Sequence, residues 1–209
     1  MMEVIVTHFK PFFLGMLICM AGYVLFYIMI AFSQIYAKSA PTVSEAGYAM
    51  GLGFSPQIFT ALLMCSAISL AITIAISGKY IDIVGRRIWL IWTTVGVALF
   101  GLVLPYFLEN GTTLSLFWFL IIGMGLIGMG YGPLASFLPE LFPTHARYSG
   151  ASLTYNIAGL FGASVAAIIA LPLNANYGLK GVGIYLTLNA VLSLIGLWFI
   201  TETRDRQLL

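Results

Sequence analysis

Charged residues are rare in this sequence. Asp, Glu, Lys and Arg make up 8% of its 209 residues, and the formal net charge is +2. A water-soluble domain carries charge on roughly a quarter of its residues, whereas 61% of this chain is hydrophobic and its mean hydropathy is +1.02. The composition therefore excludes an ordinary soluble domain, and the small net charge argues against a nucleic-acid partner.

Chemically reactive side chains are scarce as well. Cys19 and Cys65 each lie inside a long apolar run, where we expect a thiol to pack as a small hydrophobic residue. His8 and His145 lie near the ends of apolar runs, and we expect them to be solvated. The sequence contains neither a zinc-protease motif nor a phosphate-binding P-loop. It predicts no catalytic residue, no cofactor and no metal site.

Long uncharged runs take the place of these features. Six segments of 21 to 33 residues contain no charged side chain. A helix needs about 20 apolar residues to cross the hydrocarbon core, so each segment fits one crossing. Barrel-like alternation is absent, which leaves helices as the structure that can satisfy its backbone in lipid. We predict an all-α membrane protein with one six-helix domain over residues 1–209, its helices at about 12–36, 55–77, 88–107, 114–137, 151–173 and 184–200.

The distribution of Lys and Arg predicts an orientation in the membrane. When the loops are assigned alternately to two sides, one side receives seven basic residues and the other receives Lys38 and Lys180. The positive-inside rule then predicts that both termini lie in the cytoplasm. We expect the membrane to be the inner (plasma) membrane of the cell. The first run is longer than the apolar core of a signal peptide, and no small-residue cleavage site follows it, so we expect a retained helix.

Small residues recur in two of the predicted helices. Residues 123–128 match the G-x-G-x-x-G dinucleotide pattern, but that pattern needs a strand–turn–helix context, so we interpret it as helix packing. Residues 128–133, Gly-Met-Gly-Tyr-Gly-Pro, are typical of either tight packing or a hinge. A stripe of small residues in the fifth helix predicts close packing against a helix of this chain or of another; it consists of Ala158, Gly162, Ala166 and Ala170.

Uncharged polar residues are the remaining pointers to function inside the predicted helices. Tyr23 and Tyr27 lie four positions apart on one face of the first helix, and Tyr131 lies in the fourth. These tyrosines either form helix–helix hydrogen bonds or line a wet cavity that contacts a substrate. Asn156 is a weaker candidate for the same cavity.

One short segment concentrates the charge that the rest of the chain lacks. GKYIDIVGRR, residues 78–87, holds four of the sixteen charged residues. Gly78 and Gly85 would permit a tight cytoplasmic turn, and Asp82 could accept hydrogen bonds from a helix N-terminus. Arg86 and Arg87 would fix orientation and pair with acidic residues. The alternative is a charged turn that serves only as a topology anchor.

This segment resembles the G-x-x-x-D-x-x-G-R-R loop of the major facilitator superfamily. Residues 129–133 and 140–152, MGYGP and ELFPTHARYSGAS, are similar to the junction of the fourth and fifth helices in the second half of those transporters. The similarity is greatest to metabolite–proton symporters for shikimate, oxoglutarate, citrate and proline or betaine. One departure is Ile83, where the family has a basic residue. The resemblance implies helices seven to twelve of a twelve-helix fold, alternating access, and a loop that latches one half onto the other.

The expected function follows from this resemblance. The chain would be the C-terminal half of a proton-coupled transporter for an organic acid or zwitterionic osmolyte, with its first and fourth helices lining the cavity. Its partners would be the bilayer, a small substrate, protons and a second six-helix half, supplied by another chain or a second copy. Two alternatives stay open: a non-transporting remnant of a split gene, and a six-helix scaffold or binding protein that dimerises.

Overall fold

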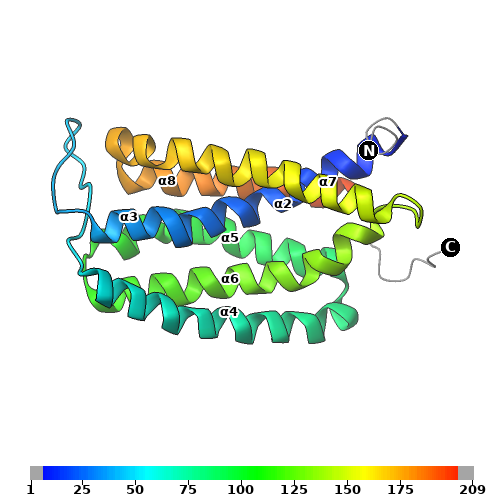
Figure 1. Cartoon of the computed structure of the whole chain (residues 1–209), viewed down its shortest axis with the longest axis horizontal. Helices are drawn as coiled ribbons and strands as arrows, with labels where there is room; N and C mark the ends of the chain where they lie inside the picture. The colour runs from blue at the N-terminus through cyan, green and yellow to red at the C-terminus, as the bar shows by residue number, and fades with distance from the viewer. Residues whose placement is uncertain (1–6, 202–209) are drawn as a thin grey trace.

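The computed structural model describes residues 7–201, and these form a bundle of long helices (Figure 1). Within that range the only β pairing is an isolated bridge between Val43 and Ala49. The helical elements are α2 (Phe9–Tyr27), η1 (Ile28–Phe32), α3 (Ser33–Lys38), α4 (Pro56–Val84), α5 (Arg86–Glu109), α6 (Thr113–Glu140), α7 (Arg147–Gly159), η2 (Leu160–Ser164) and α8 (Val165–Phe199).

Local sequence signals explain where several of these helices begin. Ser55 precedes α4, and its Oγ accepts a hydrogen bond of 3.3 Å from the N–H of Ile58, while Pro56 occupies the first helical position. Thr112 caps α6 in the same way, by accepting from the N–H of Ser115 at 3.2 Å. These caps satisfy backbone donors that the first turn of a helix leaves open.

Five helices in the described residues are long and apolar enough to cross a membrane, whereas we predicted six. The first joins α2, η1 and α3 into one run, Phe9–Lys38, in which η1 is a π-helical turn. The last, Arg147–Phe199, contains both of the final predicted spans. Gly178 separates those two spans, because its φ of 68° and ψ of −172° break the helix at that residue. Figure 1 shows the chain reversing direction there, so α8 has two arms.

Glycines set the closest helix contacts in the bundle. A methyl group at Gly101 of α5 would lie 2.8 Å from the Gly183 carbonyl oxygen of α8. A methyl group at Gly128 of α6 would lie 2.6 Å from the Leu70 carbonyl oxygen of α4. Helix pairs therefore approach backbone to backbone at these positions, as small residues allow in membranes. For the pattern at residues 123–128, this supports the interpretation as helix packing.

The small-residue stripe of the fifth predicted helix faces α2 of the same chain. Ala158, Gly162, Ala166 and Ala170 are all buried. A methyl group at Gly162 would lie 2.7 Å from Cβ of Tyr23 and 3.3 Å from the Met20 carbonyl oxygen. The question that the sequence left open, whether the stripe meets this chain or another, is answered in favour of this chain.

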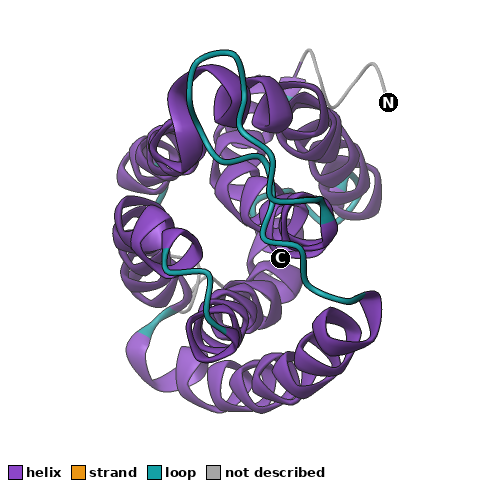
Figure 2. Cartoon of the chain, turned by 90° about the vertical axis from the view of Figure 1, so that its left-hand side faces the viewer, coloured by secondary structure: helices purple, strands orange, loops and turns teal. Residues whose placement is uncertain are grey.

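Residues 39–55 form a loop that is fastened to the reversal in α8. Ser44 Oγ donates to the Ala175 carbonyl at 2.7 Å, and Asn174 Nδ2 donates to the Ala49 carbonyl at 3.1 Å. Gly178 leaves room for the ring of Tyr48, because a methyl group there would lie 2.7 Å from that ring. Figure 2 shows the loop crossing this end of the bundle. The junctions at Gly85 and at residues 141–146 lie at the opposite end (Figure 1).

Candidate functional site

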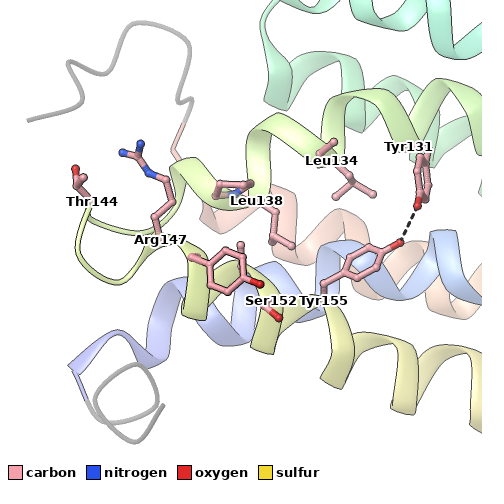
Figure 3. A pocket seen from close by; sticks show the side chains of 11 residues that line it. Tyr131, Leu134, Leu138, Thr144, Arg147, Ser152 and Tyr155 are labelled. Carbon is pink, nitrogen blue, oxygen red and sulfur yellow. Dashed lines mark hydrogen bonds between the residues drawn. The ribbon is translucent and has the colours of Figure 1, made fainter.

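Three tyrosines from three helices lie close together, and Tyr131 is 54% exposed, so the group reaches the surface of the chain. The rings of Tyr23 in α2 and Tyr155 in α7 have centroids 5.0 Å apart and are tilted by 50°. Tyr155 Oη donates to Tyr131 Oη of α6 at 3.4 Å, as Figure 3 shows. Tilted aromatic pairs at this separation are a favourable arrangement. We call these three residues the tyrosine cluster.

The tyrosine cluster lines a cavity of about 240 Å³, the inner cavity. Within residues 7–201 its lining comes from five helices and contains no Asp, Glu, Lys, Arg or His side chain. Besides the tyrosines the lining consists of Ile18, Cys19, Ala21, Gly22, Leu25, Phe26, Leu70, Ile74, Leu90, Thr93, Thr94, Val97, Leu126, Ile127, Gly130 and Leu134. The two threonine hydroxyls donate to carbonyls of their own helix, Trp89 and Leu90. Aromatic faces and a few hydroxyl oxygens are thus the groups that could contact a bound molecule.

A second and larger cavity, of about 620 Å³, lies between the end of α6 and the start of α7. We call it the outer cavity. Both cavities are lined by Tyr131, Leu134 and Tyr155, so the tyrosine cluster lies at their common boundary. Among the described residues that line the outer cavity, Arg147 is the one cationic side chain, and it lies near Thr144 (Figure 3). Its Nε is buried without a hydrogen-bond partner in the described part of the chain.

The structure brings together two of the four cavity residues that the sequence singled out. Tyr23 and Tyr131 line the inner cavity, whereas Tyr27 does not; the Tyr27 hydroxyl donates to the Ala167 carbonyl at 3.4 Å. For Tyr27 the helix–helix hydrogen bond is therefore the better interpretation. Asn156 lines neither cavity and donates to the Ser152 carbonyl at 2.8 Å.

Tyr155 is the residue of the cluster that the sequence analysis did not select. It directly precedes Asn156, and consecutive helix residues point about 100° apart, so only one of the two can face a given cavity. Tyr155, with Ala151 and Ser152 one turn earlier, faces the outer cavity. Ala151 and Ser152 lie four and three residues before Tyr155, so the three residues share one face of α7. This spacing is the sequence signal that could have identified Tyr155.

The Gly-Pro segment of α6 contributes to packing and to the cavity lining. α6 continues as one helix past Pro133 to Glu140. A methyl group at Gly132 would lie 2.5 Å from Ser77 Oγ of α4, so this glycine is needed for helix contact. Gly130 lines the inner cavity. These contacts favour the packing interpretation of residues 128–133 over the hinge.

The charged segment 78–87 is less of a turn than its sequence suggested. α4 continues to Val84, seven residues past the predicted end at 77, and α5 starts at Arg86. The whole turn is Gly85, whose φ of 101° is a conformation that side chains with a Cβ rarely adopt. Gly78 lies inside α4 with no neighbouring atom within 4 Å of an added methyl group. The expectation that Gly78 helps to form the turn was therefore wrong, while Gly85 has that role.

The two arginines of the segment fasten the α4–α5 corner to two other helices. Arg86 forms an ion pair with Glu140 at the end of α6, and its Nη2 lies 3.6 Å from Asp82 Oδ1. Arg87 donates from Nε to the Leu197 carbonyl at 2.8 Å and from Nη2 to the Trp198 carbonyl at 3.1 Å. These carbonyls belong to the last turn of α8, which lacks intrahelical partners and carries negative dipole charge.

Asp82 differs from the arginines in its exposure. Its side chain is 72% exposed, whereas those of Arg86 and Glu140 are 19% and 13% exposed. The ion pair of Arg86 with Glu140 is therefore the one shielded from solvent. The Asp82 carboxylate faces outward at the end of the bundle.

Long apolar helices around an uncharged, aromatic cavity define a class of protein: a polytopic membrane protein with room for a small molecule, and with no nucleophile–base pair in the cavity lining. The family model for sugar (and other) transporters matches residues 8–209, and the chain belongs to that family. The prediction of a transporter family of the major facilitator type is thereby confirmed. So is the prediction that the chain is not an enzyme, since its relatives are named as transport proteins.

Three relatives illustrate the range of similarity. A metabolite transport protein of Haemophilus influenzae is 89% identical over 208 residues, which cover 100% of this chain and 46% of the relative. The inner membrane metabolite transport protein YhjE of Escherichia coli is 39% identical over 96% of this chain and 44% of its own length. The glycine betaine/proline/ectoine/pipecolic acid transporter OusA of Dickeya dadantii is 24% identical over 99% of this chain and 39% of its own length.

The chain thus spans less than half the length of the curated relatives it matches. No solved structure matches it significantly.

Proposed function

We propose that this chain is the C-terminal half of a transporter that moves a small metabolite across a bacterial inner membrane by alternating access, in symport with protons. The observation that carries the proposal is the uncharged, tyrosine-lined inner cavity in a member of a transporter family. Alternating access requires two halves that rock about a site between them and needs no covalent chemistry. A largely aliphatic cavity with a few aromatic faces and hydroxyls suits that task.

Length and surface support the proposal of a half. The chain matches 46%, 44% and 39% of the length of the three relatives described above. α4 exposes an apolar row to its surroundings, consisting of Met64, Ile68, Ile72 and Ile76. Lipid or a second helical unit can cover such a row. We count six spans by taking the two arms of α8 separately, and we propose that a second six-helix unit completes the transporter.

The chemistry of the inner cavity bears on the class of substrate. No ionised side chain lines it, so this half offers no fixed charge to bind a strongly charged metabolite. An aromatic ring face attracts a cation that lies within about 6 Å of its centroid. The faces of Tyr23 and Tyr155 would suit the ammonium group of a zwitterion. A relative named for transport of glycine betaine and proline agrees with this class, with an organic acid as the alternative.

The orientation in the membrane follows from charge. The α4–α5 corner, which carries Arg86 and Arg87, lies at the same end of the bundle as the starts of α2 and α7, which carry Lys10 and Arg147 (Figure 1). Under the positive-inside rule this end faces the cytoplasm, together with both termini. The relative YhjE is named as an inner membrane protein, which supports the same membrane for this chain.

Asp82 would connect the two halves at this cytoplasmic end. In the superfamily that segment 78–87 resembles, such a loop latches one half against the other. Its exposed carboxylate suits the positive N-terminus of a helix from the second half. We therefore propose that Asp82 serves as a latch, while Arg86 and Arg87 hold the corner in place.

The exposed apolar row of α4 also favours a second candidate, a six-helix scaffold or binding protein that dimerises through α4. A chain without its other half could likewise insert in the membrane and transport nothing. A transport assay distinguishes these two alternatives from the proposed transporter. A scaffold gives no uptake whichever second half is supplied, whereas a remnant that lacks only its other half gives uptake when that half is supplied and none alone.

The test is an uptake measurement in proteoliposomes. The second half can be taken from the part of the Haemophilus influenzae relative that this chain does not match. We expect saturable uptake of radiolabelled betaine or proline, driven by a proton gradient, when both halves are present, and background uptake by this chain alone. Tyr155→Ala should reduce uptake at least about tenfold if the tyrosine cluster contacts substrate. Tyr106→Ala, an exposed tyrosine outside both cavities, is the matched control.

No uptake with both halves folded and inserted would refute transport and favour a scaffold. Full uptake by the Tyr155→Ala chain would refute the site while leaving transport intact.

A further inference from the structure

The two histidines of this chain lie side by side, although 136 residues separate them in the sequence. The sequence contains only two, His8 and His145. Their ring centroids are 6.0 Å apart with an angle of 54° between the ring planes. His8 precedes α2, and His145 lies in the loop between α6 and α7, at the end of the bundle that carries Gly85 (Figure 1).

The backbone on both sides of this pair is held in place. Phe12 N–H donates to the His8 carbonyl at 3.1 Å, which ties His8 to the first turn of α2. The N–H of Ala146 donates to the Pro143 carbonyl at 3.0 Å, which fixes the turn that carries His145. α2 and α7 pack closely below the pair, since a methyl group at Gly15 would lie 2.9 Å from the side chain of Thr154. The two imidazoles therefore project from supported positions.

The separation fits a shared metal ion. A transition metal lies about 2.0–2.1 Å from an imidazole nitrogen, which places it about 3.2 Å from the ring centroid. Two such rings around one ion have centroids about 5.2 Å apart at the tetrahedral angle and about 6.4 Å apart when the ion lies between them in a line. The observed 6.0 Å falls between these limits.

We propose that His8 and His145 form a two-histidine site for a divalent transition-metal ion. Imidazole suits Zn²⁺, Cu²⁺ and Ni²⁺, and the Irving–Williams order makes Cu²⁺ the tightest of these. Among residues 7–201 no third His, Cys, Asp or Glu joins the pair, so the proposed site takes two ligands from the described part of the chain. The bound ion fastens the start of α2 to the α6–α7 loop, next to Thr144 and Arg147 of the outer cavity. The sequence predicted no metal site, because the two histidines meet only in the folded chain.

The experiment titrates the purified full-length chain in detergent with Cu²⁺ after treatment with EDTA. The chain carries an affinity tag without histidine and the substitution Cys65→Ser, because this exposed thiol is the other soft ligand. Electron paramagnetic resonance of bound Cu²⁺ reports how many nitrogens coordinate the ion. The variants are His8→Gln, His145→Gln and the double substitution, with Lys10→Gln as the matched control for loss of a neighbouring cation.

We expect one Cu²⁺ per chain with two nitrogen ligands. Each single histidine substitution should weaken binding by at least about tenfold, and the double substitution should abolish the two-nitrogen signal. Zn²⁺ should raise the midpoint of thermal unfolding for the control and for none of the histidine variants. Equal binding by the double variant would overturn the proposal. So would two independent sites, in which each single substitution halves the amount bound and leaves the affinity of the rest unchanged.

Discussion

The ion pair between Arg86 and Glu140 provides the sharpest quantitative prediction. Arg86 has two carboxylates within reach, Glu140 at the end of α6 and Asp82 one turn earlier in α4. Glu140 is 13% exposed and Asp82 is 72% exposed. The same cation therefore takes part in one shielded pair and one solvated pair. Replacement of each carboxylate by its amide compares the two environments with little change of shape.

The magnitudes follow from burial. Breaking a fully buried ion pair by removing one partner costs about 3–5 kcal/mol, because it leaves an uncompensated charge. Arg86 and Glu140 keep some exposure, so we expect Glu140→Gln to cost about 2–3 kcal/mol. An exposed pair contributes about 0–1 kcal/mol, and we expect Asp82→Asn to cost less than about 0.5 kcal/mol. The double variant Arg86→Met with Glu140→Met removes both charges and should cost less than the sum of its two single substitutions.

The assay is unfolding in mixed micelles by increasing SDS, followed by far-UV circular dichroism. A difference of about 2 kcal/mol corresponds to about a thirtyfold change in the ratio of folded to unfolded chain, which such a titration resolves. All variants are compared in one detergent at one salt concentration. High salt should further reduce the small effect of Asp82→Asn and leave that of Glu140→Gln almost unchanged.

Equal costs for Glu140→Gln and Asp82→Asn would refute the reasoning, since burial would then not decide the strength of the pair. Strict additivity in the double variant would refute it as well. That result would mean that the two side chains stabilise the fold independently of each other.

Three further predictions test other parts of the structure. Gly85→Ala should destabilise the fold by about 1–3 kcal/mol in the same SDS titration, because φ is 101° at this residue. Gly78→Ala in the same segment should be neutral or stabilising by up to about 1 kcal/mol. A larger cost for Gly78→Ala than for Gly85→Ala would contradict the one-residue turn. Gly183→Leu should abolish the monodisperse peak in size-exclusion chromatography, because the side chain would overlap the backbone of α5, and a normal peak would show that α5 and α8 are further apart. Arg87→Ala should cost about 1–2 kcal/mol in the SDS titration through loss of two hydrogen bonds to the end of α8, and an unchanged midpoint would refute this capping role.

The spans are the part of the fold that the sequence predicted well. Charge gaps and hydropathy report on solvent directly, so the predicted helices overlap the observed ones along the whole described chain. Their ends were predicted less well. Lys79 and Asp82 seemed to end a helix at residue 77, yet α4 continues through both, because charged side chains are tolerated in a helix that emerges from the lipid. Lys180 marked the loop between the last two predicted spans, but the exact point of reversal is set by the φ of 68° at Gly178, which composition does not report.

The candidate site shows a similar division. Tyr23 and Tyr131 were recognisable because intramembrane polar residues are few. Tyr155 was missed because its orientation depends on how α7 rotates against α2 and α6, which no single-helix pattern contains. The partners of Arg87 were unpredictable for a related reason. They are backbone carbonyls 110 and 111 residues away in the sequence, and any residue type could supply them.

The accessibility of Leu134 tests the central proposal, a substrate cavity at the tyrosine cluster, most directly. Leu134 lines both cavities, whereas Leu102 is an exposed residue of α5 that lines neither. Each is replaced by Cys in a chain without Cys19 and Cys65, combined with the second half, and treated with a membrane-impermeant maleimide. Only a thiol in contact with water forms the reactive thiolate. We predict rapid labelling at 134, slowed by transported substrate, and slow labelling at 102; equal rates at both positions, with no effect of substrate, would contradict a substrate cavity at the tyrosine cluster.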